Sequence, residues 1–231
     1  MKTLVTGGAG FIGSHLCEAL VNRGDAIFVL DDLSTGRFEN IEHLDGITCV
    51  IDSTLNREIV RDLVREVDTV FHLAAAVGVE LVVNEPIRTI VNNIEGTQTV
   101  LEETCRYRRK LLITSTSEVY GKSPRKVFKE SDDLIIGPTS RTRWSYAASK
   151  AIDEFLALSY WHEKRHPVVV VRLFNTVGPR QTGRYGMVIP RFVQQALLNQ
   201  PLTVYGDGQQ TRCFTYVGDV VPALIALMER K

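Results

Sequence analysis

The chain has 231 residues, of which 44% are hydrophobic and 23% charged, the composition of an ordinary soluble globular protein. Lysine and arginine together number 27, as do aspartate and glutamate, so the formal net charge is zero. This balance gives no reason to expect nucleic acid or an anionic membrane surface as a partner.

The N-terminal residues 2–13 read KTLVTGGAGFIG, a short apolar strand followed by a glycine-rich turn and the start of a helix. A dinucleotide pyrophosphate is bound by this arrangement. Gly7 permits the tight turn, Gly10 lets the backbone approach the phosphates, and Gly13 lets the helix pack closely. The N–H groups and the dipole at the start of the helix, predicted over Ile12–Arg23, then face the negative charge.

A second predicted strand, Ala26–Asp31, ends in an acidic residue about 20 residues beyond the glycines. A carboxylate at this position can accept hydrogen bonds from both ribose hydroxyls of NAD. Asp32 follows Asp31, and the next basic residue is Arg37. A 2′-phosphate would therefore meet carboxylates, so the sequence favours NAD over NADP.

Strand and helix patterns alternate through residues 1–174 and predict an α/β fold, a doubly wound parallel sheet of the Rossmann type. Nearly continuous apolar strands suit a parallel sheet buried on both faces. The predicted strands are Thr3–Thr6, Ala26–Asp31, Ile47–Ile51, Thr69–Leu73, Leu111–Ser115 and Val168–Leu173. The predicted helices are Ile12–Arg23, Arg57–Glu66, Pro86–Tyr107 and Tyr146–Lys164.

The pattern changes in residues 175–231, where glycine and proline separate the elements. The sequence predicts a helix over Ile189–Asn199, a strand over Leu202–Tyr205 and a last helix from Asp219. We interpret this part as a small substrate-binding lobe. Because the chain ends in the helical run LIALMERK, the lobe is expected to be incomplete.

Tyr146 and Lys150 lie four residues apart in a predicted helix, so the ammonium can lie beside the phenol. A tyrosine with a pKa of about 10 is a poor base at neutral pH. A neighbouring cation and the positive nicotinamide ring favour the phenolate, so Tyr146 is expected to act as a base. Thr116 ends the preceding strand and can hydrogen-bond a substrate hydroxyl. For Ser115, Thr116 and Ser117, capping of the turn is the structural alternative.

Four cysteines, Cys17, Cys49, Cys105 and Cys213, show neither CxxC nor zinc-ligand spacing, so reduced thiols and no metal site are expected. No apolar run reaches the length of a membrane span, and the first strand begins too early to leave room for a signal peptide. The sequence therefore predicts a cytoplasmic protein without a membrane partner.

Together these motifs resemble the extended short-chain dehydrogenase/reductase family, in its nucleotide-sugar epimerase, dehydratase and decarboxylase branch. The matching segments are TGGAGFIG at 6–13, Asp31, HLAA at 72–75, NNIEGT at 92–97, STSEVYG at 115–121, Tyr146 with Lys150, RLFNTVGPR at 172–180 and VYGDGQQTRCFTYVGD at 204–219. The resemblance implies an NAD-dependent enzyme that oxidises a UDP-sugar at C4, with Tyr146 removing the proton. It also implies a homodimer formed through the helices Pro86–Tyr107 and Tyr146–Lys164.

The resemblance also assigns ligand contacts. Cofactor contacts fall on Gly7, Gly10, Phe11, Ile12, Asp31, Asp32, Ser34, Gly36, Asp52, Ser53, Leu73, Ala74, Ala75, Asn92, Ser115, Tyr146 and Lys150. Substrate contacts fall on Asn175, Thr203, Tyr205 and Arg212, with the arginine on a phosphate that its planar fork can bind bidentately. A surface ion pair is the structural alternative for Arg212.

Ser117 and Glu118 bear on the reaction, because many 4-epimerases carry small or apolar residues there. With Arg143-Trp144, the segment STSEVYG resembles the UDP-glucuronate decarboxylases, so Glu118 and Ser117 join the expected catalytic residues. A C4 ketone makes the sugar carboxylate a β-keto acid that loses CO₂ readily. Glu118 would assist by destabilising that carboxylate or positioning water. Dehydratases carry an acidic pair at this point, and Ser117 argues against dehydration.

Two alternatives remain open. The segment at 77–81, VGVEL, departs from the decarboxylase pattern, and GPRQTGRYGMVIPRF at 178–192 resembles 4-epimerases of UDP-hexoses or UDP-hexuronates. The other alternative is a non-catalytic NAD-binding module, which relatives reach by losing the tyrosine or the lysine. The presence of Tyr146, Lys150 and Thr116 favours an enzyme. UDP-glucuronate decarboxylation is the leading hypothesis.

Overall fold

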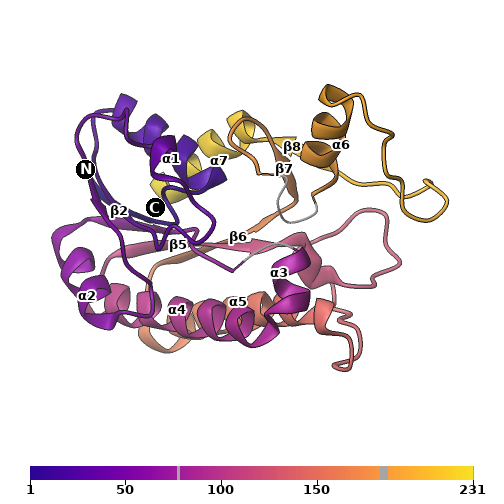
Figure 1. The fold of residues 1–231 in the computed structure, drawn as a ribbon. Helices are drawn as coiled ribbons and strands as arrows, with labels where there is room; N and C mark the ends of the chain where they lie inside the picture. Colours follow the sequence, from indigo (N-terminus) through magenta and orange to yellow (C-terminus); the bar gives the residue numbers. More distant parts are fainter. Residues whose placement is uncertain (77–78, 183–186, 231) are drawn as a thin grey trace.

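In the computed structural model, which describes residues 1–76, 79–182 and 187–230, one six-stranded parallel sheet lies between two layers of helices (Figure 1). The strand order is β3-β2-β1-β4-β5-β6. The strands are β1 (Lys2–Thr6), β2 (Ala26–Leu30), β3 (Ile47–Val50), β4 (Thr69–His72), β5 (Lys110–Thr116) and β6 (Val168–Leu173). The six predicted strands and the Rossmann-type sheet are confirmed.

The order of the strands reverses between β1 and β4, which are hydrogen-bonded neighbours although β2 and β3 separate them in the sequence. In a doubly wound sheet, ligands bind beside the carboxyl ends of the strands at such a point. The glycine-rich turn after β1, the loop after β4 and the segment after β5 therefore meet at one edge of the sheet.

Each face of the sheet is covered by its own helices: α1 and α7 on one face, and α2, α4 and α5 on the other (Figure 1). Successive side chains of a strand point to opposite faces of the sheet: Leu111 lies in the core beneath α4, and Leu112 lies in the core beneath α1. This is why the strand sequences are apolar throughout. The helices are α1 (Phe11–Asn22), α2 (Arg57–Glu66), α3 (Val79–Asn84), α4 (Pro86–Arg106), α5 (Ser145–Lys164), α6 (Val188–Leu197) and α7 (Val217–Glu229).

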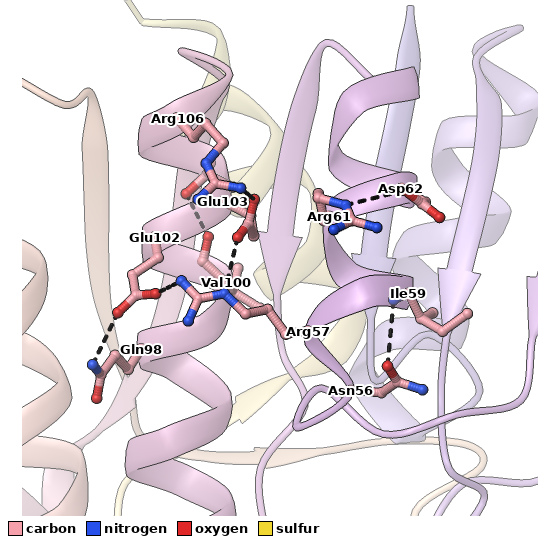
Figure 2. Close-up of polar contacts among 11 residues, drawn as sticks. Asn56, Arg57, Ile59, Arg61, Asp62, Gln98, Val100, Glu102, Glu103 and Arg106 are labelled. Carbon is pink, nitrogen blue, oxygen red and sulfur yellow. Dashed lines mark hydrogen bonds and ion pairs between the residues drawn. The ribbon is translucent and has the colours of Figure 1, made fainter.

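A buried carboxylate joins α2 to α4 (Figure 2). The Glu103 side chain is fully buried and lies 3.2 Å from Arg57 Nε and 3.2 Å from Arg106 Nη1. Arg57 also pairs with Glu102, and Asn56 caps the start of α2. Because burying a lone carboxylate is costly, the two arginines explain how Glu103 is accommodated.

The part of the chain after residue 174 corrects one prediction. The segment Leu202–Tyr205 is not a strand, because its Thr203 N–H donates to Gln195 Oε1 of α6 at 3.1 Å rather than to a strand. A different pair, β7 (Asn175–Val177) and β8 (Phe214–Tyr216), forms a two-stranded parallel sheet. The predicted helices are present as α6 and α7. The described residues also include three short 3₁₀ turns: Phe38–Asn40, Ser117–Tyr120 and Thr142–Trp144.

None of the helices in the described ranges is both long enough and apolar enough to cross a membrane.

Candidate active site

The glycine-rich turn after β1 brings backbone against backbone. Gly7 has a φ of 72°, and a Cβ there would lie 2.8 Å from the Ala74 nitrogen. A Cβ on Gly13 would overlap the Gly7 carbonyl. Phe11 and Ile12 form the first turn of α1, whose N-cap, Gly10, provides no side-chain hydrogen bond. The start of α1 thus offers its N–H groups to an anion, as a pyrophosphate requires.

Asp31 lies immediately after β2 and is buried beside this turn. Ala9 N–H donates to its Oδ2 at 2.9 Å, and Leu33 N–H donates to its Oδ1 at 2.9 Å. Burial raises the pKa of Asp31, and these two donors oppose the rise. A Cβ on Gly36 would lie 2.9 Å from Asp31 Oδ1, so the backbone closes tightly over the carboxylate. The exposed Asp32 accepts from Ser34.

Asp31→Ala is expected to weaken NAD binding, because a carboxylate that binds ribose hydroxyls contributes roughly 1.5–3 kcal/mol for each charge-assisted hydrogen bond. Isothermal titration calorimetry with NAD and NADP measures the effect. Asp45→Ala removes the same charge from an exposed turn and should leave the affinity unchanged. Equal affinity of the unmodified chain for NAD and NADP would contradict the assignment.

The loops after β3 and β4 form the next part of the site edge. Asp52 accepts from Ser53 N–H at 2.6 Å and from Asn56 Nδ2 at 2.9 Å, which shapes the turn into α2. Leu73 N–H donates to the Thr6 carbonyl and Ala74 N–H to Thr6 Oγ1, so Leu73, Ala74 and Ala75 run alongside the glycine-rich turn.

Asn93, which sequence reasoning missed beside the predicted Asn92, anchors this loop to the helices. Its Oδ1 accepts from Ala76 N–H at 2.8 Å, and its Nδ2 donates to Ser149 Oγ of α5 at 3.1 Å. Asn93 is buried four residues from both Thr89 and Thr97, which are buried as well. This spacing places the three on the inner face of α4 and could have identified Asn93 from the sequence.

Tyr146 and Lys150 project from the first turns of α5. Thr116 hydrogen-bonds the Tyr146 phenol, and burial, Glu118 and Asp153 together raise the pKa of Tyr146. That Lys150 and the nicotinamide ring together lower this pKa stays a prediction, but Lys150 is not among the groups that act on the phenol here. The physical reason is that the Lys150 ammonium is paired with Asp153, with Nζ 2.8 Å from Oδ2, while two carboxylates act on the phenol.

Glu118 lies in the 3₁₀ turn that directly follows β5, and its N–H donates to Thr116 Oγ1 at 3.2 Å. Thr116 therefore caps the turn that includes Ser117 and also contacts Tyr146. Glu118 is an exposed residue. Partial burial of its carboxyl group still raises the pKa of Glu118, and the guanidinium groups of Arg143 and Arg212 oppose the rise. Glu118 thus acts on Tyr146 and is itself acted on by two cations from separate segments.

Ser115 faces α5, on the opposite side of β5 from Leu112. Its hydroxyl donates to Glu154 Oε1 at 2.5 Å. Glu154 is paired bidentately with Arg172 of β6, with distances of 2.9 Å from Nε to Oε1 and 2.6 Å from Nη2 to Oε2. The guanidinium of Arg172 stacks over Tyr120, 4.7 Å from the ring centre. The Ser115 side chain is therefore occupied in joining β5, β6 and α5.

The predicted substrate residues fall into two groups. Asn175 Nδ2 donates to the Cys213 carbonyl, and Arg212 is exposed and acts electrostatically on Glu118. Thr203 and Tyr205 instead contact α6, with Tyr205 Oη 2.6 Å from Arg191 Nη1. Two segments were expected to distinguish a decarboxylase from a 4-epimerase: residues 77–81 and residues 178–192. Parts of both, residues 77–78 and 183–186, lie outside the described residues.

The chain belongs to the NAD dependent epimerase/dehydratase family, whose model matches residues 3–231. It is 46% identical to the UDP-N-acetyl-alpha-D-glucosaminuronate decarboxylase of Bacillus cytotoxicus over 232 residues, covering 100% of this chain and 72% of the relative. It is 40% identical to UDP-glucuronic acid decarboxylase 1 of Arabidopsis thaliana, covering 99% of this chain and 52% of that protein.

Solved structures show the same fold. The UDP-N-acetylglucosamine 4-epimerase of Methanobrevibacter ruminantium matches with a TM-score of 0.91 at 34% identity, over 100% of this chain and 73% of its own. The UDP-glucuronic acid 4-epimerase of Bacillus cereus, solved with UDP-glucuronic acid and NAD, matches with a TM-score of 0.86 at 36% identity, over 100% and 74%.

NAD is the cofactor, and the geometry fits it. The glycine-rich turn has no space for side chains at Gly7 and Gly13, the start of α1 is open to an anion, and Asp31 lies beside the turn at the end of β2. These are the features that hold a pyrophosphate and an adenosine ribose.

Proposed function

We propose that this chain catalyses NAD-dependent decarboxylation of a UDP-hexuronate, with UDP-glucuronate as the leading substrate. The observation that carries the proposal is the position of Glu118, close enough to Tyr146 to raise the pKa of the phenol and close enough to Arg143 and Arg212 to be stabilised by them. A charged carboxylate beside the base suits a reaction that expels a carboxylate as CO₂. The two relatives named as decarboxylases support this choice.

Each side chain has a distinct task in this reaction. Tyr146 takes the proton of the C4 hydroxyl, and Thr116 hydrogen-bonds the phenol. NAD, when bound, supplies the acceptor and later the donor of the hydride. Once C4 is a ketone, C5 carries a β-keto carboxylate. Loss of CO₂ leaves an enolate, which takes a proton from water at C5 before the C4 ketone is reduced. Glu118 destabilises that carboxylate by like charge, while Arg143 and Arg212 keep the anionic substrate bound.

The division of labour between the two parts of the chain is also a proposal. Residues 1–174 bind NAD and carry the catalytic residues, and residues 175–231 contribute to the nucleotide-sugar site. Asn175 and Arg212 support this role, because β7 and β8 hold them in one small sheet or just beside it. We also propose a cytoplasmic location, based on the free cysteines of the chain.

A 4-epimerase is the second candidate, favoured by the solved structures that resemble this chain. Both reactions begin with oxidation at C4, so the products distinguish them. Incubation of the NAD-loaded protein with UDP-glucuronate and, separately, UDP-glucose is followed by mass analysis. Loss of CO₂ lowers the product mass and supports decarboxylation, whereas epimerisation leaves the mass unchanged. Bound NAD without turnover of either sugar would favour a non-catalytic module.

We further propose a homodimer formed by α4 and α5, which lie side by side on the outer layer (Figure 1). Large apolar side chains are exposed on both helices, at Ile87 and Ile90 on α4 and at Ile152, Phe155, Leu158 and Trp161 on α5. At a spacing of three residues, these side chains form a ridge that runs obliquely around the exposed side of α5. A second copy would bury this ridge in a four-helix bundle.

Phe155→Asp is expected to convert the dimer to a monomer. Phe155 is 67% exposed in the single chain, and its burial would contribute about 1.5–3 kcal/mol for each copy. Light scattering coupled to size-exclusion chromatography measures the mass. Val127→Asp introduces the same charge at another exposed apolar position and should leave the dimer intact. A monomeric unmodified protein would contradict the proposal.

A further inference from the structure

Lys150 is paired with a carboxylate that the sequence motifs do not assign. Asp153 lies three residues further along α5, and its Oδ2 is 2.8 Å from Lys150 Nζ. The two side chains are 3% and 0% exposed, so neither end of the pair reaches solvent.

The Asp153 carboxylate is held from the neighbouring helix as well. Burial raises the pKa of Asp153, and Glu154 adds to the rise, whereas Lys150 and the hydrogen bond from Thr97 of α4 lower it. Thr97 is buried, and its Oγ1 lies 3.1 Å from His72 Nε2. The carboxylate thus has partners on two helices.

These groups form a chain of hydrogen bonds with one consistent direction. Burial and Lys150 lower the pKa of His72 to about 3, so the ring is neutral and has a single N–H. Thr6 Oγ1 lies 2.7 Å from His72 Nδ1. If Thr6 donates to Nδ1, then Nε2–H donates to Thr97 and Thr97 donates to Asp153. The chain then ends on the Asp153 carboxylate, whose charge is balanced by the Lys150 ammonium at 2.8 Å.

The pair is poorly arranged for stabilising the protein. The base precedes the acid along α5, which is the less favourable order for an ion pair on one helix face. Removing both charged groups from water also costs free energy, and apolar side chains at these two positions would avoid that cost. A stabilising role therefore does not account for Asp153 beside a catalytic lysine.

We propose that Asp153 is the positioning residue of Lys150: it holds the ammonium in the layer between α4 and α5 and offsets the charge that Lys150 presents to Tyr146. The inference rests on the proposed function, in which Tyr146 is the base. The other ionisable groups facing this cluster are Glu118 from the turn after β5, His72 of β4, and Glu154 of α5.

The test is the ionisation of Tyr146 in Asp153→Asn. Removing a nearby negative charge and freeing the ammonium both favour the phenolate, so the pKa of Tyr146 should fall by about one unit or more. Titration of ¹³Cζ-labelled tyrosine by NMR measures it without substrate, and Tyr146→Phe assigns the signal. In single-turnover C4 oxidation, the rising limb of the rate against pH should move to lower pH by the same amount.

Matched variants separate this role from a structural one. Asp153→Glu keeps the charge and should keep the pKa of Tyr146 close to that of the unmodified chain. Glu103→Gln neutralises another fully buried carboxylate, on α4, and should leave Tyr146 unchanged. If Asp153→Asn does not fold, Asp153→Ser removes the charge with a smaller side chain and should give the same shift.

An unchanged pKa of Tyr146 in a folded, charge-neutral variant at position 153 would overturn the inference, as would an equal shift in Asp153→Glu. The NMR readout separates this result from failure of the proposed function. A shift without turnover of any UDP-sugar would overturn the function and leave the role of Asp153 standing.

Discussion

Tyr146→Phe should abolish reduction of bound NAD⁺ by substrate while leaving cofactor affinity nearly unchanged. The substitution removes only the phenolic oxygen, and a positioned acid–base group contributes about 10²–10⁴-fold to the rate. The loss should appear in single-turnover NADH formation, measured by absorbance after mixing with UDP-glucuronate. Calorimetric titration with NAD should show an affinity close to that of the unmodified chain.

The matched control is Tyr160→Phe, the same change further along α5 at a half-buried position. It should form NADH at the unmodified rate, because Tyr160 packs against the core between α5 and the sheet, about four helical turns from Tyr146. If Tyr146→Phe still forms NADH at that rate, the base is another residue and the assignment of Tyr146 fails.

Glu118→Gln should separate the two chemical steps. Glu118 raises the pKa of Tyr146, so removing its charge lowers that pKa and does not slow C4 oxidation. Release of CO₂ should slow by about 10²-fold, since the variant loses the charge that acts on the β-keto carboxylate. NADH formation and CO₂ release from UDP-glucuronate, followed in one single-turnover experiment, measure both steps.

Glu42→Gln, on an exposed turn, is the control for the change in net charge and should affect neither step. An epimerase leaves C5 untouched, so in that case the Glu118 variant should show only a mild effect on product formation. Decarboxylation at the unmodified rate would remove the reason for preferring the decarboxylase.

The doubly wound sheet could be predicted because strands buried on both faces are apolar along their whole length. The short strands β7 and β8 could not, since three residues carry no readable period. Leu202–Tyr205 misled for the opposite reason: its alternation resembles a strand, but its backbone bonds to Gln195 of α6. Local pattern does not reveal which partner a segment finds.

The partner of Lys150 on α5 could not be predicted from the local pattern either. Tyr146 lies four residues before Lys150 and Asp153 three residues after it, so all three share one face of α5. Spacing suggested that the ammonium acts on the phenol, whereas the structure pairs it with the carboxylate at 2.8 Å. Thr97 of α4, which is distant in the sequence, also lowers the pKa of that carboxylate, and local spacing on α5 does not reveal this.

The bidentate pair of Glu154 and Arg172, with Ser115 as a third partner, fixes the position of α5 on the sheet. It binds α5 to β5 and β6 at Ser115, the residue before Thr116, about two helical turns beyond Tyr146. Sliding α5 along the sheet by a fraction of a turn would break two charged contacts at once. These contacts hold α5 in place before a ligand binds, and with it the position of the Tyr146 phenol relative to a bound sugar. A displacement of about 1 Å between reacting groups can lower a reaction rate by about 10²-fold.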